Sequence, residues 1–381
     1  MKLMHLGDLH IGKRVSGFSM LEDQKHILGQ ILAAVEAEKP DAVLVAGDVY
    51  DRSIPSEEAV KVADDFFVRL SKTGTRVLVI SGNHDSAERV AFGGRLMEAS
   101  GVHFAPVFRH DGDIVPVHLT DEHGTVTVWP IPFLKPADVR EAYPEEREDI
   151  HDYTDAMRTV IARLAIDTAG RNVAIAHQFI TGASTCDSEE KSIGGLDDIS
   201  ADVFDAFDYV ALGHLHGPQR VGRDTIRYAG SPLKYSFSEL NQKKGITMVE
   251  LGAKDDVTIR MLPLKPLHEW ERLKGSFVEL MARPETDAYV ECIITDEEET
   301  HQALDRLRGR YPNLMGIRYD NARTRSEVTA TGAESVEKKT DLELFAELFE
   351  KQNGRPMSET ERAYVSAFLT EDAGDGEEAD A

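Results

Sequence analysis

Five short motifs combine histidine, aspartate and asparagine at the points where the chain leaves an apolar run. The motifs are Gly7-Asp8-Leu9-His10, Gly47-Asp48-Val49-Tyr50-Asp51, Gly82-Asn83-His84-Asp85, the single His177, and Gly213-His214-Leu215-His216. Imidazole, carboxylate and amide oxygens are together suited to borderline or hard divalent ions such as manganese, iron or zinc. The motifs contain no thiolate of the kind that structural zinc sites use. The residue types therefore predict a divalent-metal centre.

The spacing within the motifs supports one shared site. Asp8 and His10 alternate along an extended chain, as do His214 and His216, so both members of each pair point to one side. Because ligands at the carboxyl ends of strands converge on one edge of a sheet, all five motifs are expected to meet there. Two ions about 3.5–4 Å apart can clamp a phosphodiester. One carboxylate must then bridge them, and Asp48 is the natural candidate.

Each motif alone has a plainer explanation. Most Asp-x-His pairs arise by chance, Gly-Asn-His-Asp could be only a turn, and a lone His177 at a strand end is more often structural than a ligand. Their joint occurrence at strand-to-loop junctions makes chance a poor explanation. The glycines before Asp8, Asp48, Asn83 and His214 are expected to permit tight turns out of the strands.

The elements that must position these motifs alternate along the first two thirds of the chain. The predicted strands are Leu3–Leu6, Ala42–Ala46, Val77–Ser81, Thr125–Ile131, Val173–His177, Tyr209–Gly213 and Ile226–Ala229. The predicted helices are Met20–Glu38, Ser56–Leu70 and Tyr153–Thr168. Several strands lack strict polar alternation, as strands buried on both faces do. This pattern predicts an α/β domain of two packed mixed sheets flanked by helices.

The chain changes character near Pro263 and Pro266. The expected segments are a main domain at 1–265, a small α+β domain at 266–322, a linker at 323–340, a helical hairpin at 341–370 and a disordered acidic tail at 371–381. The small domain is expected to contain a strand at Tyr289–Ile294, a helix at Glu298–Arg310 and a strand at Met315–Tyr319. The hairpin helices, Asp341–Lys351 and Ser358–Leu369, are unusually apolar for so small a unit. They either pack on their own domain or dock a partner helix.

Composition limits the function further. The two cysteines, Cys186 and Cys292, are far apart and fit a reducing cytoplasm and not a disulfide framework. We expect no signal peptide and no membrane span. The net charge of −25 is unfavourable for binding nucleic acid, and the chain without its last eleven residues still carries −19. Any DNA binding must therefore rely on bound metal, a local patch or a partner.

Longer stretches around the motifs carry a family resemblance. They are Gly-Asp-Val-Tyr-Asp-Arg-Ser-Ile-Pro at 47–55, Ile-Ser-Gly-Asn-His-Asp-Ser at 80–86, Ala-Leu-Gly-His-Leu-His-Gly-Pro-Gln at 211–219 and Tyr-Ala-Gly-Ser-Pro-Leu-Lys-Tyr-Ser-Phe at 228–237. These stretches resemble the SbcD family of nuclease subunits within the calcineurin-like metallophosphoesterase superfamily. The resemblance implies a four-layer metallophosphoesterase sandwich with a small α+β capping domain and C-terminal helices.

The resemblance also implies roles for individual residues. The first metal would be held by Asp8, His10, Asp48 and His216. The second would be held by Asp48, Asn83, His177 and His214. Manganese is the ion usual in the family. His84 would act on the scissile phosphate without binding metal, and the Asp51 carboxylate would orient it. Arg52 would either reach a phosphate or make a surface salt bridge.

The implied activity is hydrolysis of DNA phosphodiesters by a water that two metals activate. The family is a 3'-5' exonuclease on double strands and an endonuclease on single strands and hairpins, in DNA repair, recombination and replication. Its partner is an SbcC-type ATPase, whose coiled coil residues 341–370 would grip. A homodimer, to which helices at 56–70 and 88–98 could contribute, would give a heterotetramer. The rivals are a small-molecule phosphodiesterase or phosphatase of the same superfamily, and a non-catalytic scaffold that keeps only the fold.

Overall fold

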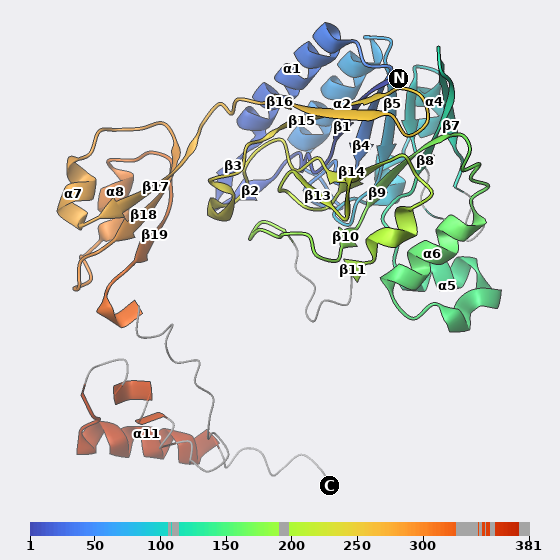
Figure 1. The fold of residues 1–381 in the computed structure, drawn as a ribbon. Helices are drawn as coiled ribbons and strands as arrows, with labels where there is room; N and C mark the ends of the chain where they lie inside the picture. Colours follow the sequence, from blue (N-terminus) through green and yellow to red (C-terminus); the bar gives the residue numbers. More distant parts are fainter. Residues whose placement is uncertain are drawn as a thin grey trace. The chain divides into compact units, whose positions relative to one another are not determined.

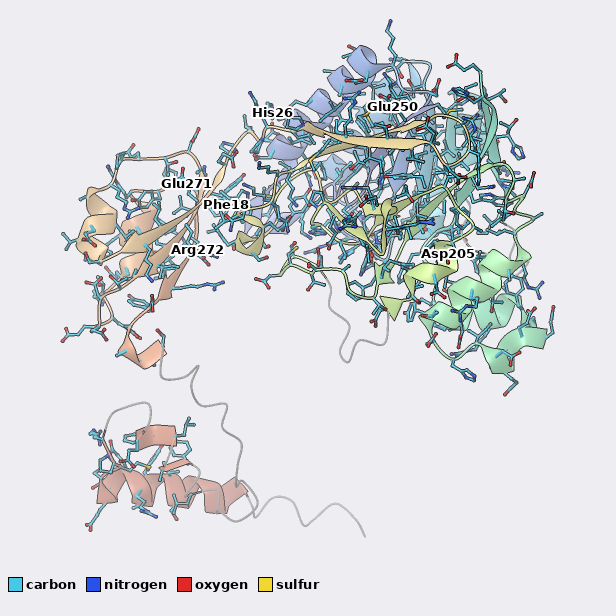
Figure 2. The ribbon with its side chains drawn as sticks, in the orientation of Figure 1. Phe18, His26, Asp205, Glu250, Glu271 and Arg272 are labelled. Atoms are coloured by element: carbon cyan, nitrogen blue, oxygen red, sulfur yellow. The ribbon has the colours of Figure 1, made fainter. Side chains whose placement is uncertain are left out.

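The structure is a computed structural model that describes most of the chain. The described residues are 1–105, 108, 114–189, 198–324, 342, 345–346, 348–350 and 355–372. They form two compact units, Met1–Trp270 and Glu271–Ala381, and Glu271 and Arg272 at the start of the second are labelled in Figure 2. Within the described residues, no helix combines the length and the apolar character needed to cross a bilayer.

The first unit is built on two six-stranded mixed sheets (Figure 1). The first sheet has the order β16 (Val257–Pro263), β15 (Gly245–Leu251), β1 (Lys2–Leu6), β4 (Ala42–Ala46), β5 (Arg76–Ile80) and β6 (Val102–Phe104). The second has the order β13 (Gln219–Val221), β14 (Arg223–Tyr228), β12 (Tyr209–Gly213), β9 (Arg171–His177), β8 (Gly124–Pro130) and β7 (Val117–Asp121). The central strands of each sheet are parallel, and β15, β16, β7 and β13 add antiparallel edges.

Apolar side chains hold the two sheets face to face. Leu44, Leu78 and Ile80 from the first sheet share one buried cluster with Val128 and Ile175 from the second. Residues on both faces of these strands are buried, which explains their nearly continuous apolar sequences. The predicted packing of two mixed sheets is therefore confirmed.

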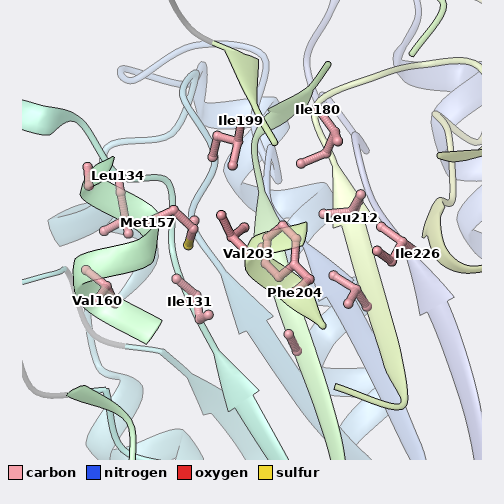
Figure 3. Close-up of a cluster of buried hydrophobic side chains, with 14 of the residues drawn as sticks. Ile131, Leu134, Met157, Val160, Ile180, Ile199, Val203, Phe204, Leu212 and Ile226 are labelled. Carbon is pink, nitrogen blue, oxygen red and sulfur yellow. The ribbon is translucent and has the colours of Figure 1, made fainter. Parts of the chain in front are cut away.

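Helices cover the outer faces. They are α1 (Leu21–Glu38), α2 (Glu57–Ser71), α3 (Ala87–Val90), α4 (Gly94–Glu98), α5 (Pro136–Ala142) and α6 (Tyr153–Arg163), with 3-10 turns η1 (Pro144–Asp149), η2 (Ala201–Phe204) and η3 (Phe237–Glu239). Figure 3 shows one buried cluster in which Phe204 of η2 lies between Met157 and Val160 of α6 on one side and Leu212 and Ile226 of the second sheet on the other. Two short strand pairs complete the unit, β2 (Arg14–Val15) with β3 (Phe18–Ser19) and β10 (Phe179–Ile180) with β11 (Asp198–Ile199).

The second unit contains a three-stranded sheet of order β17 (Trp270–Gly275), β18 (Tyr289–Ile294) and β19 (Leu314–Tyr319). Its helices are α7 (Phe277–Ala282), α8 (Ala303–Arg308) and α11 (Glu359–Asp372). Most of the predicted linker and acidic tail, and parts of the predicted helix at 341–351, lie outside the described residues.

Three predicted helices are shorter or broken. The helix from Tyr153 ends at Arg163 because Leu164 is extended, and Asp167 then caps a turn by accepting from the Ala169 N–H at 3.0 Å. A helix at 88–98 is interrupted at Gly93, where φ is 74°. The predicted helix at 298–310 begins only at Ala303, after Gln302 with φ of 52°. The antiparallel strands β15 and β16 and strand β17 are absent from the sequence prediction.

Candidate metal centre

The five motifs leave neighbouring strand ends and meet at one edge of the two sheets. Asp8 and His10 follow β1, Asp48 follows β4, and Asn83 and His84 follow β5, all in the first sheet. In the second sheet, His177 ends β9, and His214 and His216 follow β12. These are carboxyl ends of parallel strands, so the register of the sheets brings the side chains together.

Two glycines make room for a neighbouring strand, Gly213 for a strand of the facing sheet and Gly82 for the chain after β4 of its own sheet. A Cβ on Gly213 would lie 1.8 Å from the carbonyl oxygen of Ala46, and one on Gly82 would lie 2.2 Å from Oδ1 of Asp48. Neither glycine has a positive φ. The expectation that they permit turns is therefore wrong for these two positions, where the requirement is space beside a neighbouring strand. Only Gly47, with φ of 83°, fits the turn explanation.

The backbone at the centre is strained instead at non-glycine residues. Asp8, His10 and Asp48 have φ between 44° and 52°, and His214 has φ of 100°. Such conformations are sparsely populated by L-residues and persist only where the surrounding structure imposes them. Here hydrogen bonds impose them: the His10 N–H donates to Asp48 O at 2.9 Å, and the His214 N–H donates to Asp8 Oδ1 at 2.8 Å. The strain lies on residues predicted to bind metal.

The side chains form two sets that share Asp48. On one side, Nε2 of His10 lies 3.0 Å from Nε2 of His216, and Asp8 joins them within ligand distance. Asp48 Oδ2 lies 3.6 Å from Nε2 of His10. The same oxygen lies 3.4 Å from Nε2 of His177 on the other side. The structure therefore places Asp48 between the two sets.

Asn83 completes the second set. Its Oδ1 lies 2.9 Å from Nε2 of His177 and 3.0 Å from Nδ1 of His214. Nδ1 of His177 donates to the carbonyl of Ala46 at 2.8 Å, which leaves Nε2 without a proton when the imidazole is neutral. The structure brings all seven predicted ligands together.

Buried polar atoms test whether these residues fit metal ions. Asp8 is fully buried, and its Oδ2 has no hydrogen-bond partner among the described residues. The buried Nδ1 of His10 also has no hydrogen-bond partner among them. A buried carboxylate oxygen without a donor costs free energy unless a cation compensates it. The oxygen and imidazole donors around Asp48 are those of a divalent-metal site, so the residues fit such ions.

The electrostatics of the site favour cation binding. Burial lowers the pKa of His10, His214 and His216, to about 3 for His214, so each imidazole is neutral and offers a lone pair near neutral pH. Burial and, secondarily, Asp48 raise the pKa of Asp8 although His177 opposes this. Burial is the largest effect on His177 and would lower its pKa, but Asp48, Asp8 and the carbonyl of Ala46 together outweigh burial and raise the pKa to about 9. A divalent ion would take over the role of that proton.

His84 lies at the mouth of the centre and is only half-buried. Its N–H donates to Asp48 Oδ1 at 3.0 Å, and its ring stands edge-on to His10 at 4.8 Å. Its Nδ1 lies 3.1 Å from the main-chain carbonyl of Asp51. The Asp51 carboxylate lies 2.7 Å from Lys13 Nζ and 3.6 Å from Nδ1 of His10. Asp51 thus contacts the His84 ring through its main-chain carbonyl. The family resemblance implied that its carboxylate would orient this ring.

Arg52 lies on the surface of the protein. Its side chain is 79% exposed, and its Nε lies 3.8 Å from Asp51 Oδ2. This is the geometry of a surface ion pair, the second of the two alternatives from the sequence.

Several supporting residues escaped the sequence analysis. Asp85 accepts the N–H groups of Val49, Tyr50 and Gly82 at 2.9–3.1 Å, and so ties the loop of Asp48 to the loop of Asn83. Gln24 on α1 donates to the carbonyl of His10 at 2.7 Å. Asp85 belongs to the Gly82-Asn83-His84-Asp85 motif, and an aspartate in such a turn is a common acceptor for loop N–H groups. Gln24 has no local signal, because its partner is distant in sequence.

Comparisons with known proteins identify the family. The family described as calcineurin-like phosphoesterase matches residues 1–218, and the type 5 capsule protein repressor C-terminal domain matches residues 263–353. A relative from Staphylococcus epidermidis, the SbcD subunit of the nuclease SbcCD, is 29% identical over 97% of this chain and 98% of its own.

Two matching solved structures share little sequence with this chain. A dimetal phosphatase from Danio rerio is 10% identical over 70% of this chain and 98% of its own, with a TM-score of 0.45. The protein TT1561 from Thermus thermophilus is 13% identical over 68% of this chain and 98% of its own, with a TM-score of 0.40. The family match spans more than half of the chain and covers every strand-end motif. The chain belongs to the calcineurin-like phosphoesterase family.

Proposed function

We propose that this protein is a metal-dependent DNA nuclease, the phosphodiesterase subunit of an SbcCD-type complex that processes DNA ends. The observation that carries the proposal is the pair of ligand sets sharing the Asp48 carboxylate, in a chain similar along nearly its whole length to an SbcCD nuclease subunit. A small-molecule phosphatase needs neither the second unit nor the C-terminal helix α11.

The ligands divide around Asp48. Asp8, His10 and His216 would hold one ion with Asp48, and Asn83, His177 and His214 would hold the other with Asp48. Two divalent ions bound there, manganese in our proposal, would supply Lewis acidity and lower the pKa of a bound water.

The chain's own residues complete the reaction. His84 is half-buried beside Asp48 and His10, where it could reach a phosphate bound by the two ions. The carbonyl of Asp51 accepts from Nδ1–H of His84 at 3.1 Å, so proton transfer to the leaving oxygen runs through Nε2. The buried walls of the centre exclude bulk water from the opposite side, since His10, His177 and His216 are each at most 2% exposed.

The net negative charge of the chain disfavours DNA binding, so a partner must supply much of the affinity for DNA. A net charge of −25 repels phosphates outside the centre, so the ATPase partner supplies much of the binding. Residues 341–370 dock that partner's coiled coil. A homodimer, to which the segments at 56–70 and 88–98 contribute, gives a heterotetramer in the cytoplasm. Phe92 and Leu96 in the second of these segments are 85% and 83% exposed.

One comparison tests the function. Purified chain, alone and with the ATPase partner, is assayed with manganese on double-stranded ends and hairpins, and in parallel on para-nitrophenyl phosphate. Manganese-dependent DNA cleavage that exceeds monoester turnover is expected. Strong monoester turnover with no DNA cleavage, with or without the partner, would favour the small-molecule phosphatase, and absence of both activities would favour a scaffold.

A further inference from the structure

A buried chain of polar side chains stands behind His216, on the side away from Asp8 and His10. Nδ1 of His216 lies 2.6 Å from Oγ of Ser188, and Ser188 donates to Oε1 of Glu239 at 2.6 Å. Lys244 donates to Oε2 of Glu239 at 2.6 Å. His216 and Glu239 are buried, at 2% and 0% exposure.

The hydrogen-bonding capacities of these side chains decide which atoms donate and which accept in this network. An ionised carboxylate only accepts hydrogen bonds, so the hydroxyl proton of Ser188 is committed to Glu239. The lone pair of Ser188 then faces His216, whose Nδ1 must carry the proton. In a neutral imidazole that leaves the lone pair on Nε2, which is the nitrogen 3.0 Å from His10.

Further hydrogen bonds hold Glu239 and Lys244 in this network. Glu239 Oε1 also accepts from Ser236 Oγ at 3.0 Å and from the Tyr235 N–H at 3.1 Å. Lys244 donates to the main-chain carbonyl of His216 at 2.7 Å. The ammonium thus holds both the backbone of His216 and the carboxylate that directs its side chain.

The same contacts exclude a third metal at this place. Cys186, His216 and Glu239 offer ligand atoms within 4.8 Å of one another. However, Nδ1 of His216 is taken by Ser188, and the Lys244 ammonium lies on Glu239, where it would repel a cation. Burial also raises the pKa of Cys186 to about 12, so its thiol is protonated.

We propose that Ser188, Glu239 and Lys244 are positioning residues that set the tautomer of His216 and aim its Nε2 at one of the two metal positions. The proposal rests on the metal centre of the proposed function. Removing such a partner of a ligating histidine typically weakens metal binding by about 10–100-fold. Ser188 lies in a turn and Glu239 ends η3, 51 residues further along the chain, and no short sequence motif joins them.

The test compares three serine variants of the full-length chain. Ser188→Ala removes the hydroxyl, and Ser188→Thr retains it. Ser184→Ala is the matched control in the same loop, because the Ser184 hydrogen bonds to Gln219 are made by main-chain atoms. Manganese binding is measured by calorimetric titration, the His216 tautomer by nitrogen-15 NMR of the metal-free protein, and folding by the melting temperature without metal.

The expected results separate positioning from general stability. In Ser188→Ala one of two ions binds about 10–100-fold more weakly, the other is unchanged, and the Nδ1–H signature of His216 is lost. Ser188→Thr and Ser184→Ala keep both ions and the signature.

Two outcomes would count against the proposal in different ways. Two ions bound at wild-type affinity in Ser188→Ala, with the tautomer unchanged, would overturn the positioning role and leave the metal centre intact. A wild-type chain that binds no divalent ion would overturn the metal centre, and the positioning role with it.

Discussion

Oδ2 of Asp48 lies 3.4 Å from Nε2 of His177, and the same oxygen lies 3.6 Å from Nε2 of His10. His177 comes from the second sheet and His10 from the first. One carboxylate therefore contacts histidines of both sheets, and each ligand set also draws residues from both sheets, so the packing of the sheets against each other holds both sets together.

Asp48→Asn is expected to remove both ions, whereas Asp8→Asn is expected to remove one. The amide at 48 lacks the charge and the second acceptor oxygen that both sets need, while Asp8 belongs to one set only. Metal content after dialysis, measured by mass spectrometry, gives the count. Asp65→Asn on α2, whose side chain is 68% exposed, is the control. Retention of two ions by Asp48→Asn would contradict a bridging role.

His84→Ala is expected to keep both ions and to lower manganese-dependent DNA cleavage by about 10²–10⁴-fold, the range for loss of a general acid or base. The His84 side chain is half-buried and is not one of the seven proposed ligands, so its removal leaves the ligands in place. Cleavage rates and metal content are measured on the same preparation. If an ion is lost together with activity, His84 is a ligand and the assignment to catalysis is wrong.

The sequence allowed the site to be predicted better than its surroundings. Asp8, His10, His214 and His216 carry local signals, because strand-end position and residue type are both visible in a few residues. Gln24, which holds the carbonyl of His10, is a polar residue on an otherwise ordinary helix and becomes informative only when α1 packs beside β1.

The fold shows the same division. Buried parallel strands such as Ala42–Ala46 are found within a residue or two, since continuous apolar runs mark them. Strand β16 alternates half-buried and exposed residues at a sheet edge, so no buried run marks it. Helix ends were missed where one residue decided them, such as Gly93 with φ of 74°.

Asp121→Asn is expected to destabilise the fold and to flatten its acid sensitivity. Asp121 accepts from Arg171, which is buried, and lies 2.6 Å from the N-terminal ammonium of Met1. Arg171 holds the pKa of Asp121 below its ordinary value. A depressed pKa adds stability that is present above the unfolded value of 3.8 and is lost as pH falls through the folded value.

Urea unfolding between pH 2 and pH 7 measures this effect, since loss of the half-buried Asp121 leaves the buried Arg171 without its charge partner, which costs about 1–3 kcal/mol near neutral pH. Glu122→Gln, at a neighbouring side chain that is 87% exposed, should leave the pH profile unchanged. An Asp121→Asn profile as steep below pH 4 as that of the wild type would assign the acid sensitivity elsewhere.

Phe92→Glu with Leu96→Glu is expected to weaken self-association. These side chains are 85% and 83% exposed in the segment around α3 and α4, an unfavourable arrangement unless another surface covers them. Light scattering after size exclusion, over a range of concentrations, reports the mass. Val115→Glu, at a side chain that is 64% exposed elsewhere in the unit, is the control. A double variant with the wild-type mass would remove this surface from the dimer proposal.

Phe345→Asp with Leu348→Asp is expected to weaken binding to the ATPase partner while sparing the metal centre. Phe345 and Leu348 are 42% and 51% exposed in a helical segment, one turn apart, so they present one apolar stripe of the kind that docks on a coiled coil. Val278→Asp on α7, at a side chain that is 74% exposed, is the matched control in the same unit. Each variant is co-purified with the partner, and manganese binding is measured on the same protein. Loss of both partner and metal would indicate misfolding, whereas undiminished co-purification with intact metal binding would place the partner's contact elsewhere on the chain.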